Sequence, residues 1–270
     1  LGPAYPYCPR PLAYTDDTDV MGCPFYVMER IPGIVLRKDI PDSMEMSSGD
    51  VTLLGQNFIK ALYELHCVDY QGIGLGDFGK PKGYVERQVT GWSRRYRAAH
   101  TPDVPDAEVV MTWLNDKMPP DTDTPCIIHN DYKFDNVVLD PHNPLNIIGI
   151  LDWEMTTLGD PLMDLGGTLA YWIEAGDPEE VQLIRTVPTN AKGMLTRGEL
   201  VDYYEQISGL SMAHYDFYYC FGLFKLAGIC QQIYYRSFHG QTQDERFKVL
   251  GGVTAILEKA AMRVIEGSKL

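Results

Sequence analysis

The stretch His129-Asn-Asp-Tyr-Lys-Phe-Asp-Asn136, followed sixteen residues after its last Asn by Asp152-Trp-Glu154, carries most of the fold information in this chain. Short runs rich in Ile and Val at 126–129, 136–139 and 146–151 predict strands, and turn signals separate them. The polar residues therefore come at the ends of closely spaced strands. Such ends bring side chains from separate parts of the chain to one site.

The order of polar residues in this stretch suits phosphoryl transfer. Asp131 follows a strand, in a loop where its carboxylate can hydrogen-bond a substrate hydroxyl and act as a base. Asn136 offers a neutral oxygen and Asp152 a charged one, and Mg²⁺ suits such a pair because it takes few protein oxygens together with phosphate and water. Lys133 adds a cation close to the base. Phosphoryl transfer requires this kind of positioning and charge neutralisation.

Around this centre the chain divides into a small strand-bearing part and a large helical part. The run 24–31 predicts a strand that Pro32-Gly33 ends. Apolar residues at spacings of three and four predict a helix over 50–66. Further helices are expected at 84–99, 107–117, 214–236 and 244–266. Together with the central strands, this pattern predicts an α+β, two-lobe protein.

Composition excludes several classes of protein. The 270 residues are 45% hydrophobic and 22% charged, which excludes wholesale disorder and fits one large domain or two small ones. The net charge of −14 argues against nonspecific nucleic-acid binding. Six scattered cysteines without a C-x-x-C pair, no signal-peptide pattern and no uninterrupted apolar span favour a cytoplasmic protein outside the membrane.

Charge is unevenly spread along the chain. Residues 101–180 hold 17 Asp and Glu against two Lys and Arg, whereas residues 80–100 hold six Lys and Arg against one Glu. An acidic segment beside a basic one suits a metal site near an anion site. Solvated charged faces are the plainer interpretation for most of these residues.

The combined pattern resembles a known family. H-x-D-x-K-x-x-N followed by D-x-x is similar to the catalytic and metal-binding segments of protein-kinase-like folds. The His-Asn-Asp and Asp-Trp-Glu triplets resemble the aminoglycoside phosphotransferase branch, above all the phosphotransferase domains found alone in bacteria or fused to acyl-CoA dehydrogenases. The matching stretches are Gly22-Cys-Pro-Phe-Tyr-Val-Met-Glu29, Gly74-Leu-Gly-Asp-Phe-Gly79, residues 88–97, residues 151–161 and Asp164-Leu165.

The resemblance implies a two-lobe fold and roles for individual residues. Residues 1–32 would be the remnant of an incomplete N-terminal lobe with the hinge, and residues 33–270 a large, mostly helical C-terminal lobe. Asp131 would be the catalytic base, with Lys133 near the transferred γ-phosphate. The implied Mg²⁺ ligands are Asn136 and Asp152. The implied supports of the catalytic loop are His129 and Asp164. The residues implied to meet the adenine of ATP are Met28, Glu29, Arg30 and Ile150.

One part of the family pattern is missing. The glycine-rich phosphate loop and the strand lysine that holds the α- and β-phosphates should precede residue 24, yet residues 1–23 contain no Lys. We expect the upstream lobe to lie outside this sequence. The alternative is a true remnant with impaired ATP binding. In either case the chain as written is expected to be nearly or wholly inactive.

Two sets of residues are candidates for the acceptor site. Trp92-Ser-Arg94-Arg95-Tyr-Arg97 offers three guanidinium groups and two aromatic rings, which suits a phosphorylated, adenine-bearing acceptor such as a coenzyme A thioester. Tyr171 and Trp172 follow soon after the metal motif. The plainer interpretations are an exposed amphipathic helix for the first set and core packing for the second.

Three functions remain open at this point. The main hypothesis is an ATP- and Mg²⁺-dependent kinase of a small-molecule hydroxyl, with a hydroxyacyl-CoA or similar metabolite favoured over an antibiotic. An aminoglycoside kinase would use an acidic pocket, for which Glu174, Asp177, Glu179 and Glu180 are candidates. A catalytically silent nucleotide-binding module is the second class. A metal-dependent phosphohydrolase built on His129, Asp131 and Asp152 is weaker, because no further ligands for two metals are evident.

Overall fold

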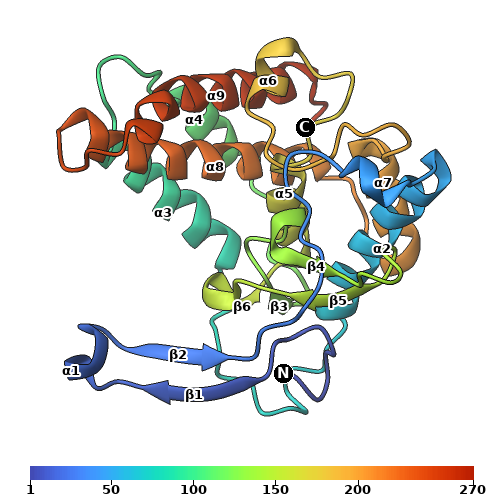
Figure 1. Cartoon of the computed structure of the whole chain (residues 1–270). Helices are drawn as coiled ribbons and strands as arrows, with labels where there is room; N and C mark the ends of the chain where they lie inside the picture. The colour runs from blue at the N-terminus through green and yellow to red at the C-terminus, as the bar shows by residue number, and fades with distance from the viewer.

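The computed structural model describes all 270 residues, and its two ends differ in character (Figure 1). A thin hairpin of β1 (Pro11–Thr15) and β2 (Phe25–Met28) projects from a large helical body, with α1 (Thr18–Met21) between the antiparallel strands. The hairpin exposes large apolar side chains, including Tyr14, which is 71% exposed. The α+β architecture with a mostly helical C-terminal part is confirmed. The strand β1 was not predicted.

The segment before the hairpin anchors it to the body. Tyr5 is buried, its hydroxyl donates to the Ala61 carbonyl at 2.7 Å, and its ring packs edge-on against Trp153. The backbone N–H of Ile150 donates to the Tyr7 carbonyl at 2.8 Å. These contacts tie residues 5–7 both to a long helix and to the central strands that carry the predicted site.

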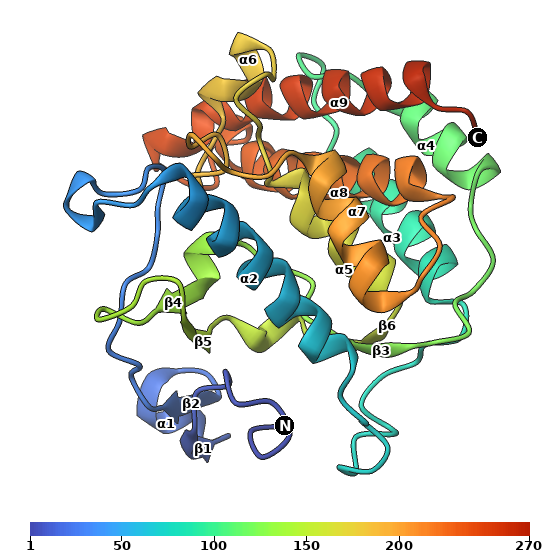
Figure 2. The same ribbon diagram turned by 90° about the vertical axis from the view of Figure 1, so that its right-hand side faces the viewer.

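That long helix is α2 (Ser48–His66), which confirms the helix predicted over 50–66. Ser47 and Asp50 form a capping box that satisfies free N–H groups of the first turn. Its buried face, which includes Leu54, Phe58 and Leu65, packs into the main core. Figure 2 shows α2 running beside the central strands.

Two short antiparallel ladders form the centre of the molecule. The strand β3 (Cys126–Ile128) pairs with β6 (Thr157–Gly159), and β4 (Val137–Leu139) pairs with β5 (Ile147–Ile150). Two 3₁₀ turns, η2 (Phe134–Asn136) and η3 (Trp153–Met155), connect strands to polar segments. The predicted strands at 126–129, 136–139 and 146–151 are confirmed, whereas β6 was not predicted. The ladders place residues 129–136 and 151–156 at neighbouring strand ends.

The remaining helices surround these ladders. They are α3 (Tyr84–Ala98), α4 (Glu108–Asp116), α5 (Pro161–Ala170), α6 (Glu179–Leu183), α7 (Arg197–Ser208), α8 (Tyr215–Phe238) and α9 (Leu250–Gly267), with 3₁₀ turns η1 (Asp42–Met44) and η4 (Glu245–Val249). In both views α8 lies along α9, and it also packs against α5 and α3 (Figures 1 and 2). None of the helices combines the length and apolar character that crossing a bilayer requires.

The contact between α5 and α8 depends on two glycines. A Cβ on Gly166 would overlap the Tyr218 carbonyl group, and a Cβ on Gly222 would overlap the Gly166 carbonyl group. The two helix backbones therefore approach more closely than any side chain would allow. This close packing fixes the position of α5, the helix that follows the predicted metal motif.

A pair of alanine substitutions tests this packing. Gly166→Ala should lower the free energy of unfolding by about 1–3 kcal/mol, because the added methyl group overpacks the helix contact. Gly167→Ala is the matched control, since no atom lies within 4 Å of its added Cβ. It should be neutral or stabilise by up to about 1 kcal/mol through helix propensity. Urea unfolding measures both, and equal effects would show that α5 and α8 do not meet at Gly166.

Candidate functional site

Asp131 lies at the centre of a cluster of polar side chains. It belongs to the polar loop, residues 129–136, which connects β3 to β4. One carboxylate oxygen, Oδ2, lies 3.0 Å from the Lys133 ammonium group and accepts a hydrogen bond from the Asn136 amide at 3.0 Å. The other, Oδ1, accepts from the Tyr171 hydroxyl at 3.2 Å. The structure thus brings together four of the residues predicted for the site.

The buried carboxylate of Asp164, on α5, holds the start of the polar loop. It accepts the backbone N–H of His129 at 2.6 Å and that of Asn130 at 2.7 Å. His66, at the end of α2, contacts it at 3.2 Å. Burial alone would raise the pKa of Asp164, but its hydrogen bonds to His66 and to the backbone of His129 hold that pKa below its usual value. Asp164 therefore holds the start of the polar loop, and its support of catalysis stays a prediction. His66 is a partner of Asp164 that the sequence did not indicate.

His129 links the polar loop to the residue before Asp152. Its Nε2 lies 2.9 Å from the Leu151 carbonyl oxygen, and its Nδ1 accepts the Asp131 N–H at 3.3 Å. Burial lowers the pKa of His129, which favours the neutral ring with its proton on Nε2. Both ring nitrogens thus have partners within the two segments, and the role of His129 as a support of the catalytic loop stays a prediction.

Asn136 and Asp152 both lie at one end of the β4–β5 ladder. The backbone N–H of Leu151 donates to the Asn136 carbonyl at 2.8 Å, so Asp152 follows directly after the residue opposite Asn136. The Asn136 Nδ2 donates to the Asp131 carbonyl at 2.8 Å, which leaves its Oδ1 as an acceptor. Asp152 is exposed and has the left-handed φ of 68°.

This pair fits a magnesium ion held partly by a ligand. No cluster of three or more His, Cys, Asp or Glu side chains in the chain could hold a metal by itself. Asn136 and Asp152 offer two hard oxygens, and Mg²⁺ in nucleotide sites takes one or two protein carboxylates together with phosphate oxygens and water. The donor set therefore fits a single Mg²⁺ ion whose coordination is completed by phosphate oxygens and water.

The four residues predicted to meet adenine separate into two groups. Met28 lies beside a cavity of about 810 Å³ that the start of the chain, the hairpin, Trp153 and Glu154 also line. Glu29 and Arg30 follow directly, and the Glu29 N–H donates to the Arg10 carbonyl at 2.9 Å. Ile150 differs, because it is fully buried.

Strand alternation explains the position of Ile150. A Cβ on the preceding residue, Gly149, would overlap Ile31, so Gly149 faces the hinge segment and Ile150 faces the opposite side. Ile150 belongs to the main core and has no surface to offer a nucleotide. We therefore correct its predicted contact with adenine.

The three arginines of α3 do not converge on one point. Arg94 and Arg97, three residues apart on one helix face, line a polar groove of about 320 Å³ against α4. Arg97 also forms a two-bond ion pair with Glu108 at 2.6 and 2.7 Å. Arg95 points elsewhere and stacks on the Trp92 ring at 4.7 Å.

The side chains of the adjacent residues Tyr171 and Trp172 lie in different environments. Tyr171 reaches Asp131, and Lys133 lies over its ring at 4.8 Å. Trp172 is 1% exposed and its indole donates to the Leu195 carbonyl at 2.8 Å. Trp172 is thus a core residue without a substrate-facing surface, and its predicted place in the acceptor site is corrected.

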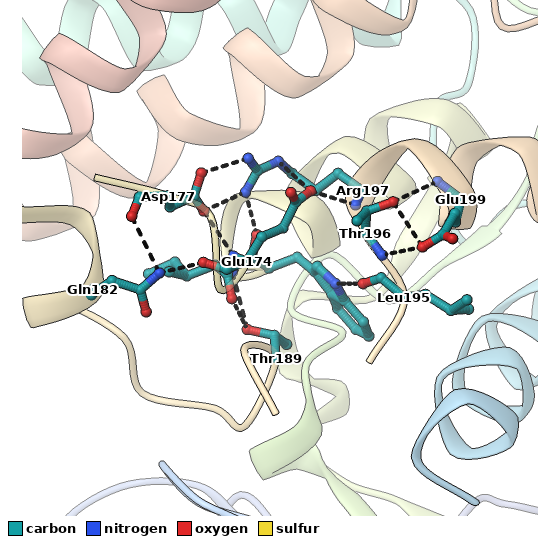
Figure 3. A network of polar contacts seen from close by, with 10 residues as sticks. Glu174, Asp177, Gln182, Thr189, Leu195, Thr196, Arg197 and Glu199 are labelled. Atoms are coloured by element: carbon teal, nitrogen blue, oxygen red, sulfur yellow. Dashed lines mark hydrogen bonds and ion pairs between the residues drawn. The ribbon is translucent and has the colours of Figure 1, made fainter. Parts of the chain in front are cut away.

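The acidic residues that follow Trp172 belong to an ion-pair network (Figure 3). The Arg197 guanidinium group binds both oxygens of Asp177 at 2.7 Å and lies 3.3 Å from Glu174. Arg197 also donates to the Trp172 carbonyl at 2.7 Å. Glu180 pairs with Lys259 and Arg263. Three of the four residues expected to form an acidic pocket are therefore already neutralised.

The chain resembles known phosphotransferases in sequence and in fold. The model of the phosphotransferase enzyme family matches residues 1–188. A solved structure from Ralstonia eutropha JMP134, of a protein classed with the aminoglycoside phosphotransferases, superposes with a TM-score of 0.83 at 30% identity, covering 97% of this chain and 79% of that one. An aminoglycoside phosphotransferase solved with AMP-PNP and hygromycin B shares the fold at a TM-score of 0.56 and 11% identity, covering 96% of this chain and 78% of that one.

The fold and its structural neighbours thus define a protein of protein-kinase-like architecture. More particularly, the chain belongs to the phosphotransferase enzyme family. It is 31% identical over 255 residues to acyl-CoA dehydrogenase family member 10 of Mus musculus, which confirms the resemblance to domains of such proteins. The match covers 94% of this chain but 23% of that relative's length.

The role of Asp164 predicts a pH dependence of stability. The pKa of Asp164 is lower in the folded protein than in the unfolded chain, so its ionised form stabilises the fold above about pH 4, and this stabilisation is lost as the pH falls further. Asp164→Asn should lower the free energy of unfolding by about 3–5 kcal/mol at pH 7, because two backbone N–H groups lose their charged acceptor.

Urea unfolding at pH 7 and below pH 4 measures this effect. The difference between wild type and Asp164→Asn should shrink in acid, and exposed Asp202 gives the control Asp202→Asn. A difference that stays constant with pH would contradict the assignment.

Proposed function

We propose that this protein is an ATP- and Mg²⁺-dependent kinase that transfers a phosphoryl group to a hydroxyl of a small molecule. The observation that carries the proposal is the convergence on Asp131 of Lys133, Asn136 and Tyr171 within 3.2 Å. The Leu151–Asn136 hydrogen bond that brings Asp152 to the same strand end supports it. Family membership supports phosphotransferase chemistry.

The side chains suggest how the transfer proceeds. The acceptor hydroxyl donates its proton to Asp131 while its oxygen attacks the γ-phosphorus, and the bond to the β-phosphate oxygen breaks to release ADP. Lys133 stabilises the negative charge of the transferred group. Asn136 and Asp152 would hold the metal ion, which neutralises phosphate charge when bound. The Tyr171 hydroxyl donates a hydrogen bond to Asp131 Oδ1. When the acceptor binds, its hydroxyl would replace the Tyr171 hydroxyl as the donor to this oxygen.

A cavity between the hairpin and the central strands supports the proposal that a nucleotide binds beside Asp131. Met28 and Glu154 line the same cavity, so the end of β2 and the turn after Asp152 border one hollow. Its volume of about 810 Å³ falls in the range of small-molecule pockets. We propose that Met28, Glu29 and Arg30 contribute to adenine binding at this edge. We also propose that residues 1–32 belong to the N-terminal lobe with the hinge and that residues 33–270 form the C-terminal lobe, so that adenine would bind where the two parts join.

An anionic acceptor fits the chain better than a polycationic antibiotic. Glu174, Asp177 and Glu180 are paired with basic side chains and give a polycation little free negative charge. The groove against α4 instead offers the positive charge of Arg94, which has no acidic partner, whereas Arg97 at its edge is paired with Glu108. Because the matched mouse relative is an acyl-CoA dehydrogenase family member, a hydroxyacyl-CoA is the acceptor we favour.

The kinase proposal is tested in the full-length protein with labelled ATP and a panel of hydroxylated metabolites. Asp131→Asn should lose roughly 10²- to 10⁴-fold in turnover while still binding Mg²⁺ and ATP, because it removes only the base. Asp152→Ala should lose Mg²⁺-dependent ATP binding, measured by calorimetry. Asp202→Asn, on the exposed side of α7, is the control.

The outcomes separate the competing functions. Equal turnover in wild type and Asp131→Asn would remove Asp131 from the mechanism. Nucleotide binding without transfer to any acceptor would favour the catalytically silent module. Release of inorganic phosphate alone, with no phosphorylated product, would favour hydrolysis.

A second prediction concerns the acceptor. The double variant Arg94→Ala/Arg97→Ala should raise KM for a coenzyme A-bearing acceptor by about 10-fold or more, because a hydrogen bond to a charged group contributes about 1.5–3 kcal/mol. KM for ATP should stay within about 2-fold. Arg246, an exposed arginine on η4 outside the groove, gives the control Arg246→Ala. An unchanged acceptor KM would exclude this groove.

A further inference from the structure

Lys225 is a cation that neither the sequence motifs nor the family match places in the site. It lies in the middle of α8, among the buried residues Phe221, Leu223 and Phe224. Its ammonium group donates to the Asn130 carbonyl at 2.9 Å and lies 3.4 Å from the Asn130 side-chain oxygen. A lysine in such surroundings loses hydration and requires a strong partner. Its partner is the residue directly before Asp131.

Asn130 has an unusual backbone conformation and contacts on all sides. Its φ of 67° lies in the left-handed region, which is uncommon for a residue other than glycine. Its side-chain oxygen accepts from the Tyr84 hydroxyl at 3.1 Å, and its side-chain nitrogen donates to the Met155 carbonyl at 2.9 Å. Its N–H binds Asp164. Strained conformations of this kind persist only where the surroundings hold them.

The Asn130–Asp131 peptide group explains what Lys225 can do. A peptide group is planar, so the Asn130 carbonyl and the Asp131 N–H point in opposite directions within one rigid unit. Lys225 binds the carbonyl, and His129 Nδ1 accepts the N–H at 3.3 Å. The peptide plane is therefore held from both edges. Its rotation would move the Cα of Asp131 and with it the carboxylate.

We propose that Lys225 is a positioning residue for the base: it fixes the Asn130–Asp131 peptide plane, and through Asn130 it joins the base to the turn that carries Asp152. This proposal rests on the kinase function proposed above. Tyr84, from α3, supports the same residue from another side.

Charges around Lys225 agree with this position. Burial lowers the pKa of Lys225, the negative charges of Asp164 and Asp131 act in the opposite direction, and Arg95 adds to the lowering. The ammonium group thus lies within electrostatic range of Asp164, which holds the loop, and of Asp131, the proposed base. It contacts neither directly and reaches the base only through the backbone.

The test uses Lys225→Met in the full-length protein, a change that keeps the side-chain stem and removes the donor. We expect kcat to fall roughly 10- to 100-fold, because misplacement of a catalytic group by about 1 Å has effects of this size. KM for ATP should stay within about 2-fold, because Lys225 acts only through Asn130. Lys259→Met, which removes an exposed ammonium group paired with Glu180, should leave kcat unchanged.

Two further variants separate positioning from general damage. Tyr84→Phe should lower kcat by a smaller factor, and the Lys225→Met/Tyr84→Phe double variant should lose less than the product of the single effects, because both act on Asn130. If Lys225→Met does not fold, Lys225→Gln serves instead, since its side chain stays polar but is one bond too short to reach the carbonyl.

A direct measurement of the loop makes the result independent of turnover. Hydrogen–deuterium exchange of a peptide spanning residues 128–136 should be faster in Lys225→Met than in wild type or Lys259→Met. Wild-type kcat in Lys225→Met, or unchanged exchange in this peptide, would overturn the proposal. If wild type phosphorylates no acceptor, the kinase function fails, and the exchange result alone decides whether Lys225 holds the loop.

Discussion

A buried negative charge requires partners, and Asp164 finds them in the backbone of the polar loop. Burying an ionised carboxylate is unfavourable unless hydrogen bonds and opposite charge compensate it. The two backbone N–H groups of residues 129 and 130, together with His66, supply this compensation. The loop conformation and the ionised carboxylate therefore stabilise each other, and α5 can carry the carboxylate there because Gly166 lets it pack directly on α8.

The same anchoring extends to the second half of the site. Asn130 and Asp152 both adopt left-handed backbone conformations, each beside a residue that hydrogen-bonds to the other segment. His129 reaches the Leu151 carbonyl, and Asn130 reaches the Met155 carbonyl. Local strain in the two segments is thus balanced by cross-links between them. A displacement of one segment would be transmitted to the other, so Asp131 and the proposed metal ligands Asn136 and Asp152 keep a common geometry.

Much of this arrangement could be predicted from the sequence. Apolar spacing identified α2, and the polar motif identified Asp131, Asn136 and Asp152 as neighbours at strand ends. The three-residue strand β6 could not be predicted, because its extended conformation depends on pairing with β3. Tyr171 and Trp172 are adjacent and directly follow α5, but the Tyr171 side chain points toward Asp131 and the Trp172 side chain into the core. The residue types alone do not indicate which of the two aromatic rings is buried.

Residues that act at long range were missed for a related reason. His66 and Lys225 lie 98 and 95 positions from their partners Asp164 and Asn130, so no spacing pattern connects them. A charged residue within an apolar helix is the one signal that Lys225 offers. Such a residue is unfavourable in a core and therefore indicates a specific polar partner.

The structure changes the interpretation of the acidic excess in residues 101–180, because it shows which partners several of these carboxylates bind. Asp164 holds the loop, Asp160 caps α5, and Asp177 and Glu174 bind Arg197. These four carboxylates bind partners within the protein and therefore contribute little to attracting cations from solution. The negative charge of these four residues therefore says little about the substrate, because attraction depends on charges left free at the surface. Arg94 lines an open groove, which makes the short basic segment the better guide to acceptor charge.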